Sequence, residues 1–294
     1  MATEVFAPAK INLTLHVTGR REDGYHMLDS LVNFAPVGDL LTISDGDGLS
    51  LRVDGPEAEG VPEDGSNLVI RAAALLGGAA ALHLHKTLPA ASGIGGGSSD
   101  AAAALRGLSA RRGGGNASAG ALLAAHGQEI LALGADVPMC LHARPLRAQG
   151  VGEAITPVSL PQVAAVLVNP RLQVSTPAVF RALERRDNTP MPPELPPMRD
   201  AAELIAFLSE MRNDLQAPAC AVQPVIHDVL ARIDAQPGCA LARMSGSGAT
   251  CFGLFLTETE AAASARAIAA AEPGWWVASG VLGDCSALAT PRAQ

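Results

Sequence analysis

Several residue types that build ligand and metal sites are scarce in this sequence. Aromatic residues make up 3% of its 294 residues, and Tyr25 is the single tyrosine. The five cysteines are widely spaced and form no C-x-x-C pair. This spacing excludes the common zinc motifs and favours reduced, buried thiols in a cytoplasmic protein over disulfides. The chain also has no G-x-x-x-x-G-K-[ST] motif, and therefore no P-loop.

Long apolar runs and excess positive charge are missing as well. No stretch of 18 apolar residues occurs, and residues 1–6 have neither a basic region nor an apolar signal core. We therefore expect no membrane span and no targeting segment. The net charge of −8 argues against nucleic acid or a membrane surface as a partner. Hydrophobic residues make up 48%, enough for one large domain or two fused ones, and we expect a monomer or a weak homodimer.

Lysine is the rarer of the two strongly basic residues. Only two of the 21 Lys and Arg residues are lysines, Lys10 and Lys86. Because arginine is used elsewhere, each lysine is a candidate for a site that needs a compact ammonium group. For Lys86, chance survival explains the residue equally well.

Residues 4–18 alternate in polarity with the period of a β-strand. Ile11 and Leu13 face one way, whereas Lys10 and Asn12 share the other face, which we expect to lie away from the core. The following turn, 19–26, brings the single tyrosine next to His26. This pair is suited to aromatic recognition, although the turn alone is equally typical of an ordinary surface turn.

A loop rich in glycine and serine, residues 89–99, leads directly into a helical run. Four of its residues are glycines, Gly93, Gly95, Gly96 and Gly97. Glycine permits positive φ and leaves room for a ligand beside the backbone. We expect Ser98 or Ser99 to cap a helix that begins at or just before Asp100. Free N–H groups at such a helix start bind anions, most often phosphate; the alternative is a flexible linker.

The remaining pattern predicts alternating helices and strands. In the first half we expect a hairpin of strands 40–44 and 49–53, a loop over 54–65, a helix over 67–80, a strand over 81–88, a break over 111–116, a helix over 117–133 with an interruption near 127, and a strand over 146–153. Asp136 lies in a glycine-bounded turn before an apolar segment that reads as a strand. A helix cap, a turn residue and a catalytic group all stay open for it.

The second half predicts a ferredoxin-like order of elements. Its expected strands are 164–169, 240–244, 251–256 and 275–282, and its expected helices are 175–185, 201–210, one after 213, 222–235 and 258–272. A proline-rich loop covers 188–197, and a second glycine–serine turn covers 245–249.

Three motifs, in this order and spacing, resemble the signatures of the GHMP small-molecule kinases. They are Ala-Pro-Ala-Lys-Ile-Asn-Leu at 7–13, the glycine-rich segment 93–102, and Met-Ser-Gly-Ser-Gly-Ala at 244–249. The resemblance covers nearly the whole chain. It implies an α+β fold of two domains: a ribosomal-S5-domain-2-like, ATP-binding domain over 1–153 and a ferredoxin-like domain over 154–294. The active site would lie in the cleft between them, and the last strand is free to return to the first domain.

The resemblance also implies an ATP-dependent kinase that uses Mg²⁺. The segments 24–26, 134–138 and 150–153 also resemble one branch of this family. The kinases of that branch phosphorylate the 2-hydroxyl group of a cytidine diphosphate derivative of methylerythritol, in the non-mevalonate route to isoprenoid precursors. Asp136 would act as the base. Lys10 would keep Asp136 ionised and stabilise charge on the transferred phosphate. Mg²⁺ would arrive with ATP, without a certain protein ligand.

Binding roles follow from the same resemblance. ATP would contact Pro89, Gly93, Ile94, Gly95, Gly96, Gly97, Ser98 and Ser99, with Asn67 and Lys86 near its base and ribose. The acceptor would contact Asn12, Tyr25, His26, Asp136, Thr176, Phe180, Ser245 and Gly246. Two alternatives remain, a mevalonate- or homoserine-type kinase and a non-catalytic nucleic-acid-binding module. Tyr25, His26 and Phe180 argue for a base-binding pocket, and the negative net charge argues against the module.

Overall fold

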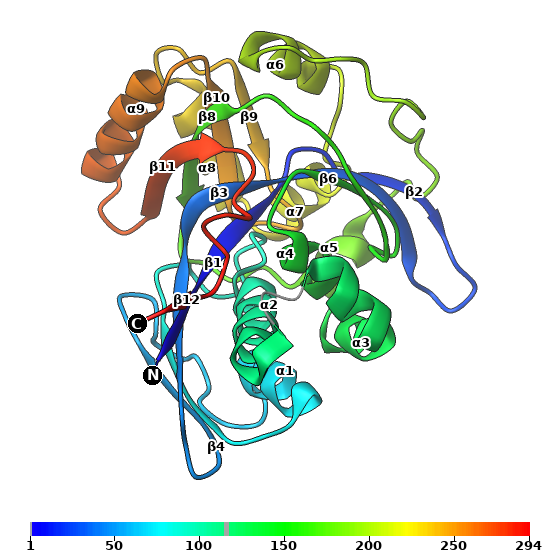
Figure 1. Ribbon diagram of the computed structural model, residues 1–294. Helices are drawn as coiled ribbons and strands as arrows, with labels where there is room; N and C mark the ends of the chain where they lie inside the picture. The colour runs from blue at the N-terminus through cyan, green and yellow to red at the C-terminus, as the bar shows by residue number, and fades with distance from the viewer. Residues whose placement is uncertain (1, 115–117) are drawn as a thin grey trace.

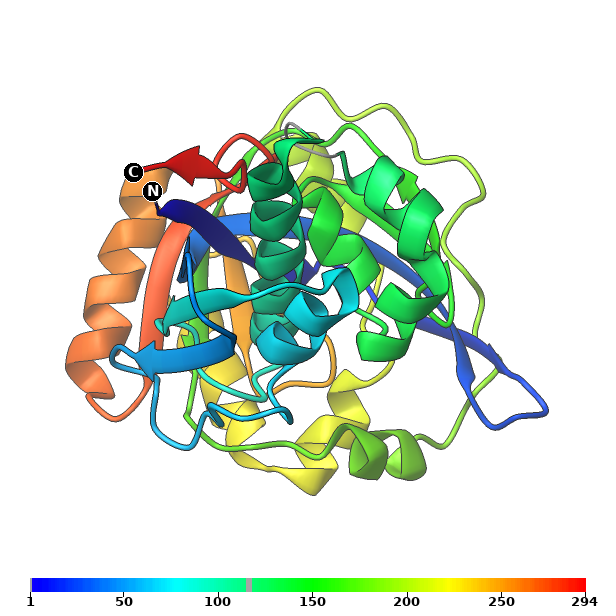
Figure 2. The ribbon, with the colours of Figure 1, turned by 60° about the horizontal axis from the view of Figure 1, so that its bottom comes forward.

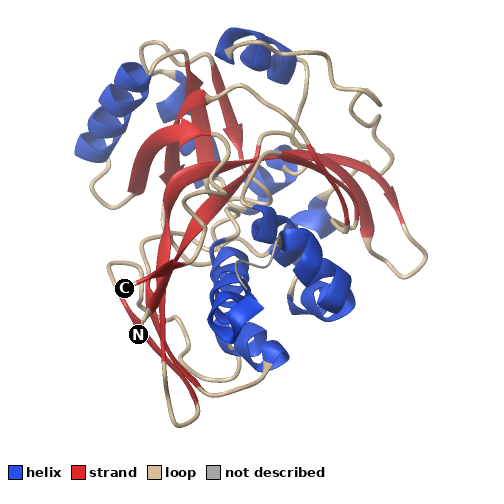
Figure 3. Ribbon diagram, viewed as in Figure 1, coloured by secondary structure: helices blue, strands red, loops and turns tan. Residues whose placement is uncertain are grey.

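The computed structural model describes residues 2–114 and 118–294, and these form two β-sheets with helices (Figures 1 and 3). The eight-stranded first sheet contains β1 (Thr3–Asn12), β2 (His16–Arg20), β3 (His26–Ser44), β4 (Leu49–Asp54), β5 (Ala80–His85), β6 (Leu146–Gly150), β7 (Ala154–Pro157) and β12 (Arg292–Ala293). Its helices are α1 (Leu68–Leu76), α2 (Gly96–Ser109), α3 (Ala119–Leu133) and α4 (Val137–His142), with a π-helical turn at Ala110–Gly114. The parts of the predicted break and helix that fall on 115–117 lie outside the described residues.

Strand β3 is the centre of the first sheet. It is 19 residues long and pairs with β1, β2, β5 and β6. The predicted hairpin between β3 and β4 is wrong, because β5 lies between them and pairs in parallel with β4. Leu82 and Leu84 of β5 are buried, so the more apolar strand occupies the inner position. Strand β4, which exposes Ser50 and Arg52, lies at the edge.

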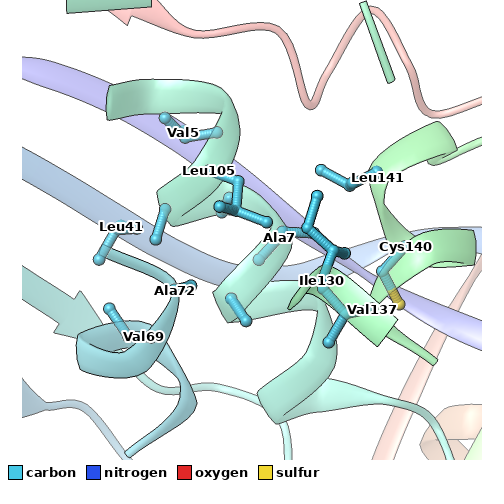
Figure 4. Close-up of a cluster of buried hydrophobic side chains, with 14 of the residues drawn as sticks. Val5, Ala7, Leu41, Val69, Ala72, Leu105, Ile130, Val137, Cys140 and Leu141 are labelled. Atoms are coloured by element: carbon cyan, nitrogen blue, oxygen red, sulfur yellow. The ribbon is translucent and has the colours of Figure 1, made fainter. Parts of the chain in front are cut away.

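Helix α2 forms the core of the first domain against β1 and β3. Ala101–Leu105 are fully buried, and Figure 4 shows Leu105 packed among Val5, Ala7 and Leu41. Small side chains let the helix lie close to the sheet, since a Cβ on Gly107 would come within 2.5 Å of the Ile43 side chain. This packing fixes the position of the helix start, where the glycine-rich loop ends.

The second sheet has the predicted ferredoxin-like topology. Its strands are β8 (Val163–Asn169), β9 (Leu241–Met244), β10 (Cys251–Phe255) and β11 (Trp276–Leu282), in the antiparallel order β11-β8-β10-β9. Its helices are α5 (Thr176–Ala182), α6 (Ala201–Ser209), α7 (Gln216–Val222), α8 (Val225–Asp234) and α9 (Glu258–Ala271). The Ser175 side chain caps α5 by accepting a hydrogen bond from the Ala178 N–H.

The chain returns to the first sheet at its C-terminal end. The predicted last strand, β11, stays in the second sheet, and the short β12 then pairs with β1 beside the N-terminus (Figure 2). The first sheet also continues past residue 153, because β7 pairs with β6. The domain limits given above stay a prediction. Among the described residues, we find no helix of the length and apolarity that a bilayer crossing requires.

Two local predictions are corrected by the packing. The segment 4–18 is two strands rather than one. Lys10 and Asn12 lie outside the hydrophobic clusters, as expected, but they are buried, because the first sheet lies between helices α1–α4 and the second domain (Figure 3). The apolar segment after Asp136 is the short helix α4, not a strand. Pro138 fits its first turn, where no backbone N–H is needed.

Candidate active site

A cavity of about 790 Å³ is lined by residues of both domains. Thirteen of the predicted site residues line it: Lys10, Asn12, Tyr25, His26, Gly93, Gly95, Gly96, Gly97, Ser98, Asp136, Thr176, Phe180 and Gly246. Six do not, namely Asn67, Lys86, Pro89, Ile94, Ser99 and Ser245. The structure thus gathers segments that are far apart in the sequence around one space.

The glycine-rich loop reaches the cavity at the N-terminus of α2. Gly95 has a φ of 67° and is the N-cap, so the helix begins at Gly96, four residues before Asp100. The predicted serine cap is therefore wrong, because glycine adopts the left-handed conformation that ends the loop early. The Ser99 hydroxyl instead donates to the Pro8 carbonyl at 2.8 Å. Ser98 lies one turn inside the helix and lines the cavity.

The third motif packs directly on this loop. A Cβ on Gly93 would lie 2.7 Å from the Ser245 carbonyl oxygen, and a Cβ on Gly246 would lie 2.8 Å from the Gly93 carbonyl oxygen. The Ser245 hydroxyl donates to that Gly93 oxygen at 3.1 Å and accepts from the Asn12 N–H at 3.0 Å. Ser245 therefore joins three motifs from behind the wall rather than facing the cavity.

Lys10 and Asp136 form an ion pair at the cavity wall. Their charged atoms, Nζ and Oδ2, are 3.0 Å apart, and the side chains are 4% and 37% exposed, respectively. Lys10 Nζ also donates to Asn12 Oδ1 at 2.7 Å, and Asn12 Nδ2 donates to the Ser30 hydroxyl at 2.7 Å. Asp136 stands at the N-cap position of α4, but its carboxylate makes no capping hydrogen bond. The carboxylate is therefore free to accept a proton from a bound hydroxyl group.

An aromatic stack occupies another part of the wall. The rings of His26 and Phe180 are stacked with centroids 4.6 Å apart and an angle of 21° between the planes. Burial lowers the pKa of His26, and the charges of Arg20 and Arg186 lower it further. His26 Nε2 is buried and has no hydrogen-bond partner in the described part of the chain. Tyr25, the residue before His26, also lines the cavity and is 65% exposed. A flat ligand can therefore reach the Tyr25 ring.

Lys86 lies in a buried ionic cluster beneath the glycine-rich loop. Its ammonium group contacts Asp39 and lies 2.8 Å from Asp100 Oδ2. Burial raises the pKa of Asp100 to about 8, against the opposing effect of Lys86. For Lys86, burial alone would lower the pKa, but the two carboxylates raise it overall. A Cβ on Gly96 would lie 3.5 Å from Lys86 Nζ, so the cluster supports the first turn of α2 from inside the protein.

Asn67 is likewise occupied within the protein. Its Oδ1 caps α1 by accepting from the Val69 N–H at 2.8 Å, and its Nδ2 donates to the Pro62 carbonyl at 2.7 Å. Contacts of Asn67 and Lys86 with the ATP base or ribose stay predictions. Sequence reasoning missed Ser247, whose hydroxyl lies 2.7 Å from that of Thr176, and Arg181, which follows Phe180 and also lines the cavity.

A glycine-rich anion site next to a Lys–Asp pair, enclosed between these two domains, defines a small-molecule kinase. Residues 67–144 match the family described as GHMP kinases N terminal domain, and residues 181–273 match GHMP kinases C terminal. A protein of Cereibacter sphaeroides named 4-diphosphocytidyl-2-C-methyl-D-erythritol kinase is 54% identical over 94% of this chain and 97% of its own length. A protein of the same name from Paramagnetospirillum magneticum is 50% identical over 92% and 95%.

Solved structures agree with these relatives. A crystal structure of 4-(cytidine 5'-diphospho)-2C-methyl-D-erythritol kinase has a TM-score of 0.75 at 35% identity and covers 95% of this chain and 99% of its own. A homoserine kinase from Cytophaga hutchinsonii, with a TM-score of 0.68 at 18% identity over 99% and 96%, shows the shared fold alone. The chain belongs to the 4-diphosphocytidyl-2-C-methyl-D-erythritol kinase family of the GHMP kinases, which confirms the resemblance and the two-domain α+β fold that it implied.

Proposed function

We propose that this chain transfers the γ-phosphoryl group of ATP to the 2-hydroxyl group of 4-diphosphocytidyl-2-C-methyl-D-erythritol. One observation carries the proposal: the Lys10–Asp136 pair, at 3.0 Å, shares a cavity with the glycine-rich loop and with the His26–Phe180 stack. The cavity thus combines a proton acceptor, an anion site and a reader for a flat base. The names of the relatives, which are 50–54% identical, support this acceptor.

In the proposed mechanism, Asp136 accepts the proton of the attacking hydroxyl group. Lys10, 3.0 Å from this carboxylate, stabilises negative charge that develops on the attacking oxygen. Asn12 orients the lysine, since its Oδ1 accepts from Lys10 Nζ while its Nδ2 is fixed by Ser30. Backbone N–H groups at the start of α2 bind the ATP phosphates. The chemistry then depends on positioning the two substrates rather than on a covalent intermediate.

Mg²⁺ would be held mainly by the ATP phosphates and would neutralise their charge. The donor set at the loop fits this limited protein role. The Ser99 hydroxyl is used by the Pro8 carbonyl, and the Asp100 carboxylate lies in the buried cluster with Lys86. The Ser98 hydroxyl lines the cavity and is the side chain we assign to the metal or to a phosphate oxygen.

The test is an ADP-release assay with Mg-ATP and the cytidine-linked acceptor, followed by identification of the 2-phosphate product. We expect turnover with this acceptor and none with mevalonate or homoserine. Turnover with either of those alcohols alone would reassign the chain to another branch of the family. RNA binding without ATP binding would instead support the non-catalytic module.

Location and assembly are further parts of the proposal. We infer a cytoplasmic protein that is a monomer or a weak homodimer and has no nucleic-acid partner. The net charge of −8 supports the last point. Sedimentation of the purified protein at several concentrations measures its assembly directly.

A further inference from the structure

The charged groups on the cavity wall do not balance. Among the described residues that line it, Lys10, Asp136 and Arg181 carry permanent charge at neutral pH. Lys10 and Asp136 form their own ion pair at 3.0 Å. Arg181 is exposed, and its guanidinium group has neither an ion pair nor a hydrogen bond to the part of the chain that the structure describes. The cavity therefore presents one uncompensated cation, in a protein whose net charge is −8.

The helix α5 places this cation beside the base-reading stack. Phe180 and Arg181 are neighbours on α5, and both line the cavity together with Thr176 and Pro177, one helical turn earlier. The phosphate loop, by contrast, belongs to α2 of the first domain. The anion site at that loop and the guanidinium group of Arg181 are thus supplied by different domains.

Other arginines add positive charge around the same stack. The pKa of His26 is lowered, after the effect of burial, by Arg20 and by Arg186. Neither arginine has an ion pair within the described residues; Arg20 Nε donates to the Gly24 carbonyl at 3.1 Å, and Arg186 has no side-chain hydrogen bond there. A ligand whose base stacks on His26 therefore meets cations from two segments of the chain.

We propose that Arg181 binds the diphosphate group of the cytidine-linked acceptor, with Arg186 and Arg20 contributing longer-range attraction. The inference rests on the proposed function. In a cytidine diphosphate compound, one ribose separates the base from the first phosphate. A cation next to the His26–Phe180 stack therefore lies near the negatively charged diphosphate. A guanidinium group presents two parallel N–H donors that match phosphate oxygens. Different groups then bind the two anionic substrates: backbone N–H groups bind ATP, and the Arg181 side chain binds the acceptor.

Binding of simple probes tests this assignment without turnover. Titration calorimetry compares CDP with cytidine on the wild type, Arg181→Ala, and the control Arg266→Ala, which removes an exposed arginine on α9. We expect the wild type to bind CDP more tightly than cytidine. Arg181→Ala is expected to weaken CDP binding by about 10- to 100-fold, the loss of a charged hydrogen-bonded pair. Cytidine binding by this variant, and both affinities of the control, are expected to stay unchanged.

Kinetics supply an independent readout. In Arg181→Ala, we expect the KM for the cytidine-linked acceptor to rise while kcat and the KM for ATP stay near wild type. In Arg181→Lys, we expect a KM for the acceptor between those of the wild type and Arg181→Ala, because an ammonium group keeps the charge but lacks the two parallel N–H donors of guanidinium. Equal losses for CDP and cytidine would show that Arg181 only packs against the base, and would overturn the inference. So would a wild type that does not distinguish the two probes. Failure of the wild type to phosphorylate the acceptor would overturn the proposed function instead.

Discussion

At the scale of single residues, Lys10 and Asp136 differ in exposure although their charged atoms are 3.0 Å apart. Lys10 is enclosed and fixed by Asn12, whereas Asp136 is open to the cavity. In the proposed mechanism, the lysine is therefore a fixed positive charge, and the carboxylate is the group that meets substrate. Scarcity of lysine pointed to Lys10, but burial of its ammonium group could not be predicted, because it depends on Asp136 and the Gly95 backbone being brought against β1 from distant parts of the sequence.

Removing the carboxylate tests the base directly. Asp136→Asn keeps the shape of the side chain but cannot accept the hydroxyl proton, so we expect kcat to fall by on the order of 10²-fold or more. ATP binding, measured by calorimetry, is expected to stay near wild type. Asp228→Asn, an exposed aspartate on α8, is the matched control. Near-normal kcat in Asp136→Asn would remove Asp136 from the role of base.

The lowered pKa of His26 gives a prediction for stability at acid pH. Burial is the main cause, followed by Arg20 and Arg186. The unfolded chain takes up this proton near the ordinary pKa of about 6.5, and the folded protein takes it up only at lower pH. The folded state therefore loses stability relative to His26→Phe, which keeps a stacked ring, as the pH falls below about 6.5. Thermal unfolding of both proteins between pH 5 and 8 measures the difference; a constant difference would contradict a lowered pKa.

At the scale of elements, α2 carries both the phosphate loop and the buried cluster of Lys86, Asp39 and Asp100. Asp100 Oδ1 is buried without a hydrogen-bond partner in the described residues, and a raised pKa is what such burial produces. The helix start is thus supported by a buried carboxyl group whose pKa is raised. The cluster joins α2, through Asp100, to β3 and to the residue that follows β5.

Asp100→Asn keeps the shape of the side chain but removes its titration. The folded pKa of Asp100, about 8, lies above the unfolded value, so ionisation costs stability as the pH rises toward 8. The unfolding temperature of the wild type is therefore expected to fall relative to Asp100→Asn between pH 6 and 8 and to level off above that. Lys86→Met, which removes the cation from the buried side chains of Asp39 and Asp100, is expected to cost about 3–5 kcal/mol. If the wild type and Asp100→Asn respond to pH identically, Asp100 is already ionised at pH 6.

Local patterns in the sequence predicted most elements but not their partners. The ferredoxin-like order and the interruption near residue 127 are confirmed; the interruption is a kink at His126. The hairpin of β3 and β4 is wrong because strand order depends on which strands bury both faces, a property of the whole sheet. The helix start was misplaced because a left-handed Gly95 replaced the serine cap. Motifs led to the thirteen predicted residues that line the cavity, whereas Arg181 belongs to no motif and only the cavity points to it.

At the scale of the whole molecule, main-chain and side-chain hydrogen bonds join the two domains. The Gly283 N–H donates to the Phe34 carbonyl at 2.9 Å, and the Leu15 N–H donates to the Arg212 carbonyl at 2.9 Å. Trp276 of β11 donates from Nε1 to the Thr87 carbonyl at 2.8 Å, just before the phosphate loop. Such links favour unfolding of both domains together.

Fluorescence offers a test of this cooperation, since both tryptophans, Trp275 and Trp276, lie in the second domain. We expect thermal curves from tryptophan fluorescence and from far-ultraviolet circular dichroism to coincide. Trp276→Phe removes the hydrogen bond to Thr87 and leaves a part-buried carbonyl without this donor, so it is expected to lower stability by about 1–3 kcal/mol. Two separated transitions in the wild type would show that the domains unfold independently.

The contact between Gly93 and Gly246 has a consequence for how this site can change over evolutionary time. The phosphate-binding loop and the turn behind it meet through main chain, with no space for a Cβ on either glycine. Selection can therefore alter phosphate recognition very little by exchanging side chains there. The proposed acceptor pocket, with His26, Phe180 and Arg181 in its wall, can diverge one side chain at a time, so under the proposed function a lineage can acquire a new acceptor while it keeps its phosphate donor.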